Sequence, residues 1–175
     1  MDFKQRLVIS YIWELPFGKG KQGWRDALIG GWQLSGVTSF QSGIPLVITV
    51  PNAAPFPGLS SRAVRLRSGA LSEGQTRDHW FDTDAFRLPD AFTLGNDSRT
   101  QPDLRGPGLR NFNVSLSRRI SFTEKIRLQF RVEAQNLFNR AQLDNPVGSK
   151  NSADFGRIIS GGNPRLIQLG LRLTF

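Results

Sequence analysis

The strict alternation of apolar and polar residues between residues 125 and 135 constrains the fold more than any other feature. Ile126, Leu128, Phe130, Val132 and Ala134 occupy one parity, and the other parity carries every charged residue of the segment. Successive side chains of a β-strand point to opposite faces, whereas a helix would distribute these residues around its axis. The segment therefore predicts a strand with one apolar face and one polar face.

The same alternation recurs in four other parts of the chain, each with aromatic and aliphatic residues on one parity. A short Thr123-Glu124 turn separates two of these strands and predicts an antiparallel hairpin. The predicted fold class is all-β, an antiparallel meander of long amphipathic strands. The five strands are expected at approximately residues 3–15, 31–50, 109–122, 125–138 and 165–175.

Long connections alternate with short ones along the chain. Residues 51–108 are rich in Pro, Gly, Ser, Asp and Arg and have no sustained period, which predicts one very long loop. A second loop, rich in Asn, Gly and Ser, is expected from about residue 139 to 164, whereas the connection at 17–30 is of modest length. Outer-membrane barrels have this asymmetry, with long loops outside the cell and short turns in the periplasm.

Strand length and facing both favour a bilayer. Strands of about 10 residues or more suit the roughly 9 to 11 residues that a tilted strand needs to cross the hydrocarbon. Lipid would face the apolar parity and water in the barrel lumen the polar parity. The lipid-facing residues are predicted to be Leu128, Phe130, Val132, Leu169 and Leu171. The lumen-facing residues are predicted to be Arg127, Arg131, Glu133 and Arg172.

Arg118 departs from this pattern because it falls on the apolar parity of its strand. A charge there costs about 2 to 4 kcal/mol at the bilayer midplane and about 0 to 1 kcal/mol near an interface. Either the side chain reaches the nearby periplasmic interface, or a β-bulge at Arg118-Arg119 resets the facing. The sequence leaves both alternatives open.

The residues needed for common catalytic and metal sites are scarce. The chain has no Cys and a single His, His79, so thiolate zinc sites and His-based triads are not expected. The loop aspartates lack the spacing of known calcium loops, so turn and cap roles are expected for them. They are Asp82, Asp84, Asp90, Asp97 and Asp103. We expect no enzymatic activity, no catalytic residue, no metal and no cofactor.

The net charge of +9 is compatible with a nucleic-acid-binding surface. No zinc-finger, RRM or OB-fold signature supports that interpretation, and a basic channel lumen or solvated loops explain the charge equally simply. We therefore expect no nucleic-acid partner. A soluble all-β module that binds carbohydrate or another ligand is the more serious alternative, although it must explain the unusual strand length.

Several stretches resemble the C-terminal barrel of TonB-dependent receptors, in particular the Oar-like group that carries a carboxypeptidase-regulatory-like domain. The landmarks, soft one by one but specific in this order, cover most of the chain. They are GGWQLSGVTSFQSGIPL, HWFDTDAF, LRGPGLRNFNVSLSR, LQFRVEAQNLFNR, FGRI and NPRLIQLGLRLTF. The last stretch also resembles the signal read by the barrel-assembly machinery, whose positions would be Gln168, Gly170, Leu173 and Phe175.

The resemblance implies a bacterial outer-membrane transporter that takes up a ligand at the expense of energy delivered by TonB. Such a barrel has about 22 strands and encloses an N-terminal plug. Five strands cannot close it, so we expect the chain to be an incomplete barrel segment, from a truncated gene product or a misplaced start codon. The implied partners are outer-membrane lipid, the barrel-assembly machinery, the TonB complex through a missing N-terminal part, and an unknown cargo.

Overall fold

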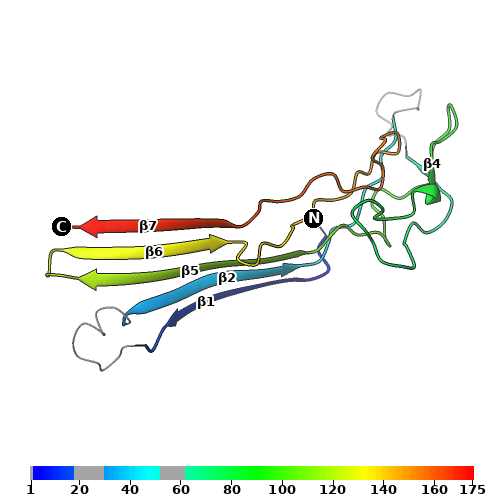
Figure 1. Ribbon diagram of the computed structural model, residues 1–175. Helices are drawn as coiled ribbons and strands as arrows, with labels where there is room; N and C mark the ends of the chain where they lie inside the picture. Colours follow the sequence, from blue (N-terminus) through cyan, green and yellow to red (C-terminus); the bar gives the residue numbers. More distant parts are fainter. Residues whose placement is uncertain (1, 18–29, 52–61) are drawn as a thin grey trace. The chain divides into compact units, whose positions relative to one another are not determined.

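The computed structural model describes residues 2–17, 30–51 and 62–175 (Figure 1). The chain divides into two compact units. The sheet unit comprises Arg6–Gln41, Arg110–Ala141 and Asn163–Phe175, and the loop unit comprises Met1–Gln5, Ser42–Leu109 and Gln142–Gly162. Each unit is described by itself below.

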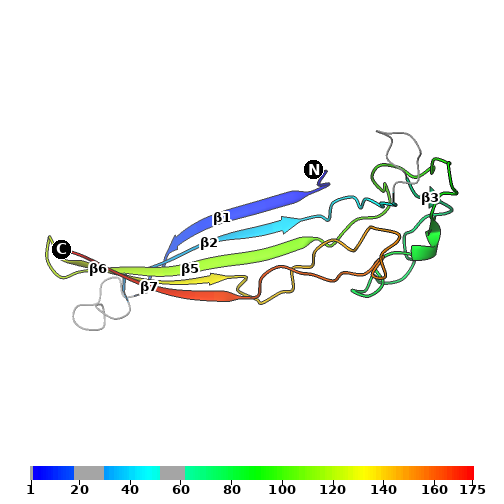
Figure 2. The same cartoon turned by 90° about the horizontal axis from the view of Figure 1, so that it is seen from above.

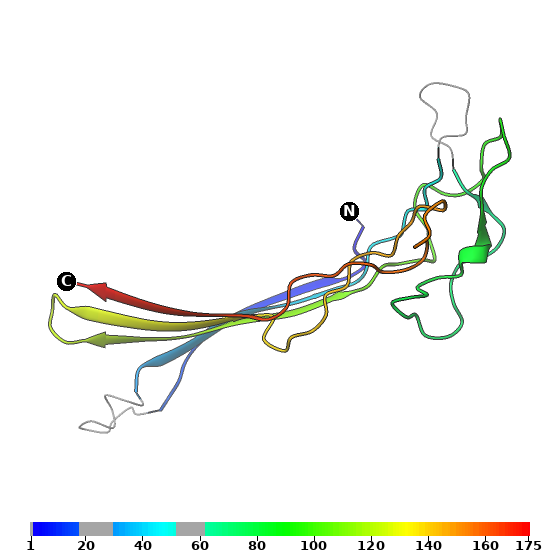
Figure 3. The same cartoon turned by 45° about the horizontal axis from the view of Figure 1, so that its top comes forward.

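The sheet unit contains one five-stranded sheet in the order β1-β2-β5-β6-β7. Neighbouring strands run in opposite directions, and the strand direction rotates from β7 to β1, as sheet twist requires (Figures 1 and 3). The predicted antiparallel meander is thus confirmed, and the sheet is open, as in an incomplete barrel. The strands are β1 (Arg6–Glu14), β2 (Trp32–Gln41), β5 (Leu109–Ser121), β6 (Arg127–Gln135) and β7 (Leu166–Thr174).

The strand register separates an apolar face from a polar face. Leu128 lies opposite Leu173, and Val132 lies opposite both Leu169 and Leu116. Directly opposed residues of an antiparallel pair share a face, so these side chains form one apolar surface across three strands. Gln129 lies opposite Arg119 and Arg172 on the other face.

The facing of Arg118 is settled by this register. Pairing between β5 and β6 runs without interruption from Val114 to Ser121, so no bulge occurs at Arg118-Arg119. Arg118 lies opposite Phe130 on the apolar face, and its guanidinium carbon is 5.8 Å from the ring centroid of Trp32. The ring of Trp32 also makes an edge contact with Phe130. The face of an aromatic ring attracts a cation, which offsets part of the cost of placing this charge among apolar residues.

The two ends of the sheet differ in their connections. At one end, a tight turn joins β5 to β6, with Phe122 N–H donating to the Ile126 carbonyl at 3.0 Å. At the opposite end, Arg6 pairs with Gln41 and Gln135 pairs with Leu166, and the chain leaves the sheet there for the loop unit. The predicted modest connection at 17–30 lies largely outside the described residues.

Strand β2 ends earlier than the expected strand at 31–50. Residues 42–50 belong to the loop unit and form isolated bridges instead of a ladder, between Pro45 and Arg105 and between Thr49 and Ser149. Pro45 has no N–H to donate to a ladder. The apolar side chains that follow it, Leu46 and Ile48, are buried in a local core instead of on a sheet face.

The described part of the long connection predicted at 51–108 contains short secondary-structure elements and a core of its own. The two-residue strands β3 (Val64–Arg65) and β4 (Phe86–Arg87) pair antiparallel, and a short 3-10 helix, η1 (Thr83–Ala85), precedes β4 (Figures 1 and 2). The Asp82 side chain caps this helix by accepting a hydrogen bond from Asp84 N–H at 2.9 Å.

Three phenylalanines organise the core of the loop unit. Phe81 and Phe86 are almost fully buried, and each makes an edge contact with the other and with Phe155, at centroid separations of 5.2 to 6.4 Å. Residues from distant parts of the sequence complete the core, so no local periodicity reveals it. They are Leu46, Ile48, Ala63, Ala85 and Leu104.

Replacing a core phenylalanine should unfold the loop unit. We expect Phe81→Ala to destabilise it by about 3 to 5 kcal/mol, the typical cost of a large-to-small change in a core. Phe92→Ala is the matched control, because this side chain is 79% exposed. Hydrogen exchange of residues 62–109 in the purified membrane protein measures the difference, and equal protection in both variants would contradict the presence of a core.

Candidate functional site

The polar face of the sheet is the candidate functional surface. It carries all four residues predicted to face the lumen, because Arg127, Arg131, Glu133 and Arg172 share one face by register. Serine, threonine, asparagine and glutamine side chains fill most of the remaining positions on this face. Exceptions are Val8, Ile12, Val37 and Leu166, whose apolar side chains are exposed there.

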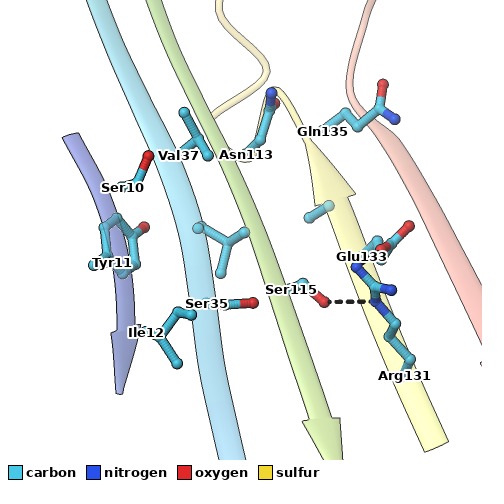
Figure 4. A pocket seen from close by; sticks show the side chains of 13 residues that line it. Ser10, Tyr11, Ile12, Ser35, Val37, Asn113, Ser115, Arg131, Glu133 and Gln135 are labelled. Atoms are coloured by element: carbon cyan, nitrogen blue, oxygen red, sulfur yellow. Dashed lines mark hydrogen bonds and ion pairs between the residues drawn. The ribbon is translucent and has the colours of Figure 1, made fainter. Parts of the chain in front are cut away.

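A trough of about 680 Å³ lies on this face across β1, β2, β5 and β6 (Figure 4). Its polar lining comes from hydroxyl, amide and charged groups. Arg131 crosses to the neighbouring strand, where its Nε donates to the Ser115 hydroxyl at 3.0 Å, and it also forms an ion pair with Glu133. Other lining residues are Ser10, Ile12, Ser35, Val37, Asn113 and Gln135.

Gly36 is required where β1, β2 and β5 meet. Tyr11 lies opposite it, and a Cβ built on Gly36 would come within 2.6 Å of the Tyr11 hydroxyl and 2.7 Å of the Asn113 carbonyl oxygen. Contacts this short are prohibitive, so the ring of Tyr11 occupies space that only glycine leaves free. The alternation of residues 31–43 does not predict this pairing, since the partner strand is not local.

Three arginines gather near the end of the polar face that carries the β5–β6 turn. Gln129 lies opposite Arg119 on β5 and Arg172 on β7, and Arg127 is two positions away on the same strand. Arg127 and Arg172 are among the residues predicted to face the lumen, and Arg119 is not. Only the register between β5 and β6, which the Thr123-Glu124 turn could have suggested, brings Arg119 into this group.

The positive charge of the chain resides in the sheet unit. The sheet unit has 13 Lys and Arg residues against 4 Asp and Glu residues, whereas the loop unit has 10 basic and 10 acidic residues. The sheet unit therefore carries the whole net charge of +9. The five strands hold 7 Arg against 2 Glu, a net charge of +5, and the connections within the unit hold the remaining +4. A basic lumen and solvated connections therefore both contribute to the basic character of the chain.

The apolar face has no cover within the described residues along β7. Leu169 is 69% exposed and Leu171 is 71% exposed, and both point to the same side as Phe130 and Val132. A contiguous apolar surface of this kind marks contact with a membrane or a partner. The predicted lipid-facing residues thus share one face, and Leu128 lies on it as well.

The proposed assembly-signal residues lie along β7 and at its end. Leu173 is on the apolar face opposite Leu128, and Gln168 is on the polar face opposite Glu133. A Cβ on Gly170 would meet only Arg131, at 3.8 Å or more, so packing within the described chain does not demand glycine at this position. Phe175 is 94% exposed.

Ion pairs stabilise the loop unit outside the strands. Asp103 accepts hydrogen bonds from the Arg65 guanidinium and the Ser68 hydroxyl, each at 2.5 Å. Partial desolvation raises the pKa of Asp103, but these two bonds lower it more, so its pKa lies below the ordinary value of 3.8. Asp82 behaves alike, because desolvation is outweighed by hydrogen bonds from Arg67 and Asp84 N–H, and its pKa is also lowered.

No group of three or more His, Asp or Glu side chains that could hold a metal ion occurs in the described part of the chain. His79 makes backbone hydrogen bonds with Thr76 in an exposed turn. Across residues 2–17, 30–51 and 62–175, no helix has the length and apolar character needed to cross a membrane.

Comparison with known proteins identifies the family. A family model described as "Outer membrane beta barrel domain" matches residues 1–168, and the chain belongs to this family. No curated protein and no solved structure was found to match the chain.

Family membership places the protein in the bacterial outer membrane. This confirms the predicted localisation and the predicted class, an incomplete segment of a membrane β-barrel. It favours the membrane-embedded prediction over a soluble binding module. The match does not distinguish TonB-dependent receptors from other members.

Charges should be tolerated on one face of β6 and not on the other. We expect Val132→Arg to block assembly, because an arginine facing lipid costs about 2 to 4 kcal/mol at the bilayer midplane. Gln135→Arg adds the same side chain to the polar face of β6, away from Arg119, Arg127 and Arg172, and is the control. The amount of heat-modifiable barrel in isolated outer membranes measures assembly, and equal yields for the two variants would contradict the assignment of faces.

Acid should weaken the loop unit through Asp103. Because its pKa is lowered by folding, the carboxylate contributes stability above its ordinary pKa of 3.8, and this stability is lost as the pH falls through the lower folded value. We expect Asp103→Asn to lower the unfolding temperature at pH 7 and to reduce the further loss at pH 3, as measured by scanning calorimetry.

The control for this measurement is Asp90→Asn, which removes a carboxylate from an exposed pair with Arg87. It should leave the unfolding temperature at pH 7 nearly unchanged, because exposed ion pairs contribute little. Identical unfolding temperatures for Asp103→Asn and the unmodified protein at pH 7 would show that the Arg65 and Ser68 contacts do not stabilise the unit.

Proposed function

We propose that this chain forms part of the barrel wall of a TonB-dependent outer-membrane transporter that takes up a ligand not yet identified. The observation that carries the proposal is a folded loop unit connected to one end of an amphipathic sheet. A buried core gives the loop unit a preorganised surface, and such a surface lowers the cost of ordering side chains when a receptor binds its ligand.

The resemblance to Oar-like receptors supports the same conclusion. Its landmarks fall in both units: HWFDTDAF contains the core residue Phe81 and the helix cap Asp82, and LQFRVEAQNLFNR contains strand β6. The cap and the core residue hold η1 in place. The resemblance therefore includes residues with a clear structural role in the loop unit as well as the strands.

The proposal assigns partners by face. Outer-membrane lipid would contact the apolar face, cargo would contact the loop unit and the polar face, and the TonB complex would act through an N-terminal part outside this chain. The barrel-assembly machinery would recognise the end of β7, where glycine at position 170 has no packing reason within the described residues. The proposal includes no catalytic residue and no nucleic-acid partner.

Crosslinking in cells of the source organism tests energy coupling. An antibody against residues 82–103 should detect a heat-modifiable outer-membrane band much heavier than 19.5 kDa. After formaldehyde treatment, part of this band should shift into a complex that an antibody against TonB also recognises. A strain without TonB is the control and should lack the shifted band.

The outcomes separate the levels of the proposal. A heat-modifiable outer-membrane band that never joins a TonB-containing complex would leave the barrel family intact but contradict energy-coupled transport. Loss of the shifted band in the TonB-deficient strain, with the barrel band retained, is the expected result.

A further inference from the structure

Arg119, Arg127 and Arg172, here called the arginine cluster, surround Gln129 on the polar face. Arg119 and Arg172 are on the two strands that flank β6, so their backbones are about 10 Å apart, given strand spacings of about 4.8 Å. Arg127 is two residues from Gln129, about 7 Å along the strand. One small ligand can reach all three side chains.

No carboxylate within the described residues forms an ion pair with the cluster. All three residues are exposed, and the Arg127 guanidinium donates a hydrogen bond to the Glu124 carbonyl at 3.5 Å. The polar face of the described strands has two carboxylates, Glu133 and Glu14. Glu133 is already paired with Arg131. Glu14 is on β1, with β2 between it and β5.

Three like charges at this spacing create a positive potential that a bound anion would neutralise. Guanidinium groups bind phosphate and carboxylate with two parallel hydrogen bonds, a geometry that a simple ammonium cannot match. The walls of a barrel have a low dielectric constant, which strengthens the attraction of an anion inside the lumen. The cluster is therefore suited to an oxyanion with more than one charged group.

We propose that the arginine cluster binds a small multivalent oxyanion, a ligand with two or more phosphate or carboxylate groups. The trough includes Arg131, which is two residues from Gln129, and its hydroxyl and amide groups would hold the uncharged part of such a ligand. Its volume of about 680 Å³ is typical of sites for small molecules. An acidic polypeptide has the same charges but would not need this trough.

This inference goes beyond the proposed function, because it requires only that the polar face line a barrel lumen. A barrel without TonB coupling could bind the same anion. A protein that does not bind the anion could still crosslink to TonB. A protein that does not crosslink to TonB could still bind the anion.

Calorimetric titration of the purified membrane protein with tripolyphosphate, at about 0.15 M salt, tests the proposal. We expect saturable binding that Arg119→Gln, Arg127→Gln and Arg172→Gln each weaken about tenfold, since a charge-assisted hydrogen bond is lost. The control is Arg6→Gln, which removes a charge from the same face at the opposite end of the sheet. It should change the affinity less than twofold.

A second variant separates bidentate recognition from charge alone. Arg172→Lys keeps the charge and should still weaken binding severalfold, and all variants must show the heat-modifiable band of a folded barrel. Three results would overturn the proposal: no binding by the unmodified protein, equal weakening by Arg6→Gln, or binding of a hexaglutamate peptide without binding of tripolyphosphate.

Discussion

Pairing of backbone groups between neighbouring strands is the constraint on which the rest of this structure depends. A chain that crosses hydrocarbon has no water to satisfy its N–H and C=O groups, so each strand must take its hydrogen bonds from its neighbours. That requirement pairs β1 with β2 and β6 with its two neighbours, and the apolar pattern and the turn lengths select the register of these pairs. The register then decides which side chains share a face, and hence which residues meet lipid and which meet the lumen.

The two faces of the sheet differ in the number of charged side chains that they carry. The strands of the sheet unit place most of their charged side chains on one face, while Arg118 lies on the other and is accommodated beside Trp32 and Phe130. The loop unit, which is not made of long amphipathic strands, balances its charges within itself through pairs such as Arg65 with Asp103. Charged side chains are thus separated by face in the sheet unit and paired with one another in the loop unit.

The strands could be predicted from the sequence because their information is local. Alternation in residues 125–135 needs no knowledge of any other part of the chain, and it separates Leu128 and Val132 from Arg131, as the register does. The class of the fold followed from the same signal. Arg118 could not be resolved in this way, because a bulge and a charge on the apolar face produce the same sequence.

The loop unit could not be predicted, because its stabilising contacts join residues far apart in sequence. Phe81 packs on Phe155, and Gln101 is held by Asp97 and by the Arg65 guanidinium, with no periodic spacing among them. Such a segment has no sustained hydrophobic period of 2 or 3.6 residues, so its core residues do not stand out in the sequence. The buried Gln101 is as informative as the aromatic core, since its side-chain oxygen and nitrogen both have partners and its backbone N–H donates to Leu46.

The arginine cluster could be predicted from the sequence only in part. Each of its members is on the parity that alternation assigns to the polar face, so their facing is local information. Their grouping is not, because it depends on Gln129 pairing with Arg119 on one side and Arg172 on the other. A hairpin turn one residue longer would shift the register of β5 against β6, and because side chains alternate with a period of two, Arg119 would then meet the apolar row of β6. The turn from Phe122 to Ile126 therefore places a charge as well as joining two strands.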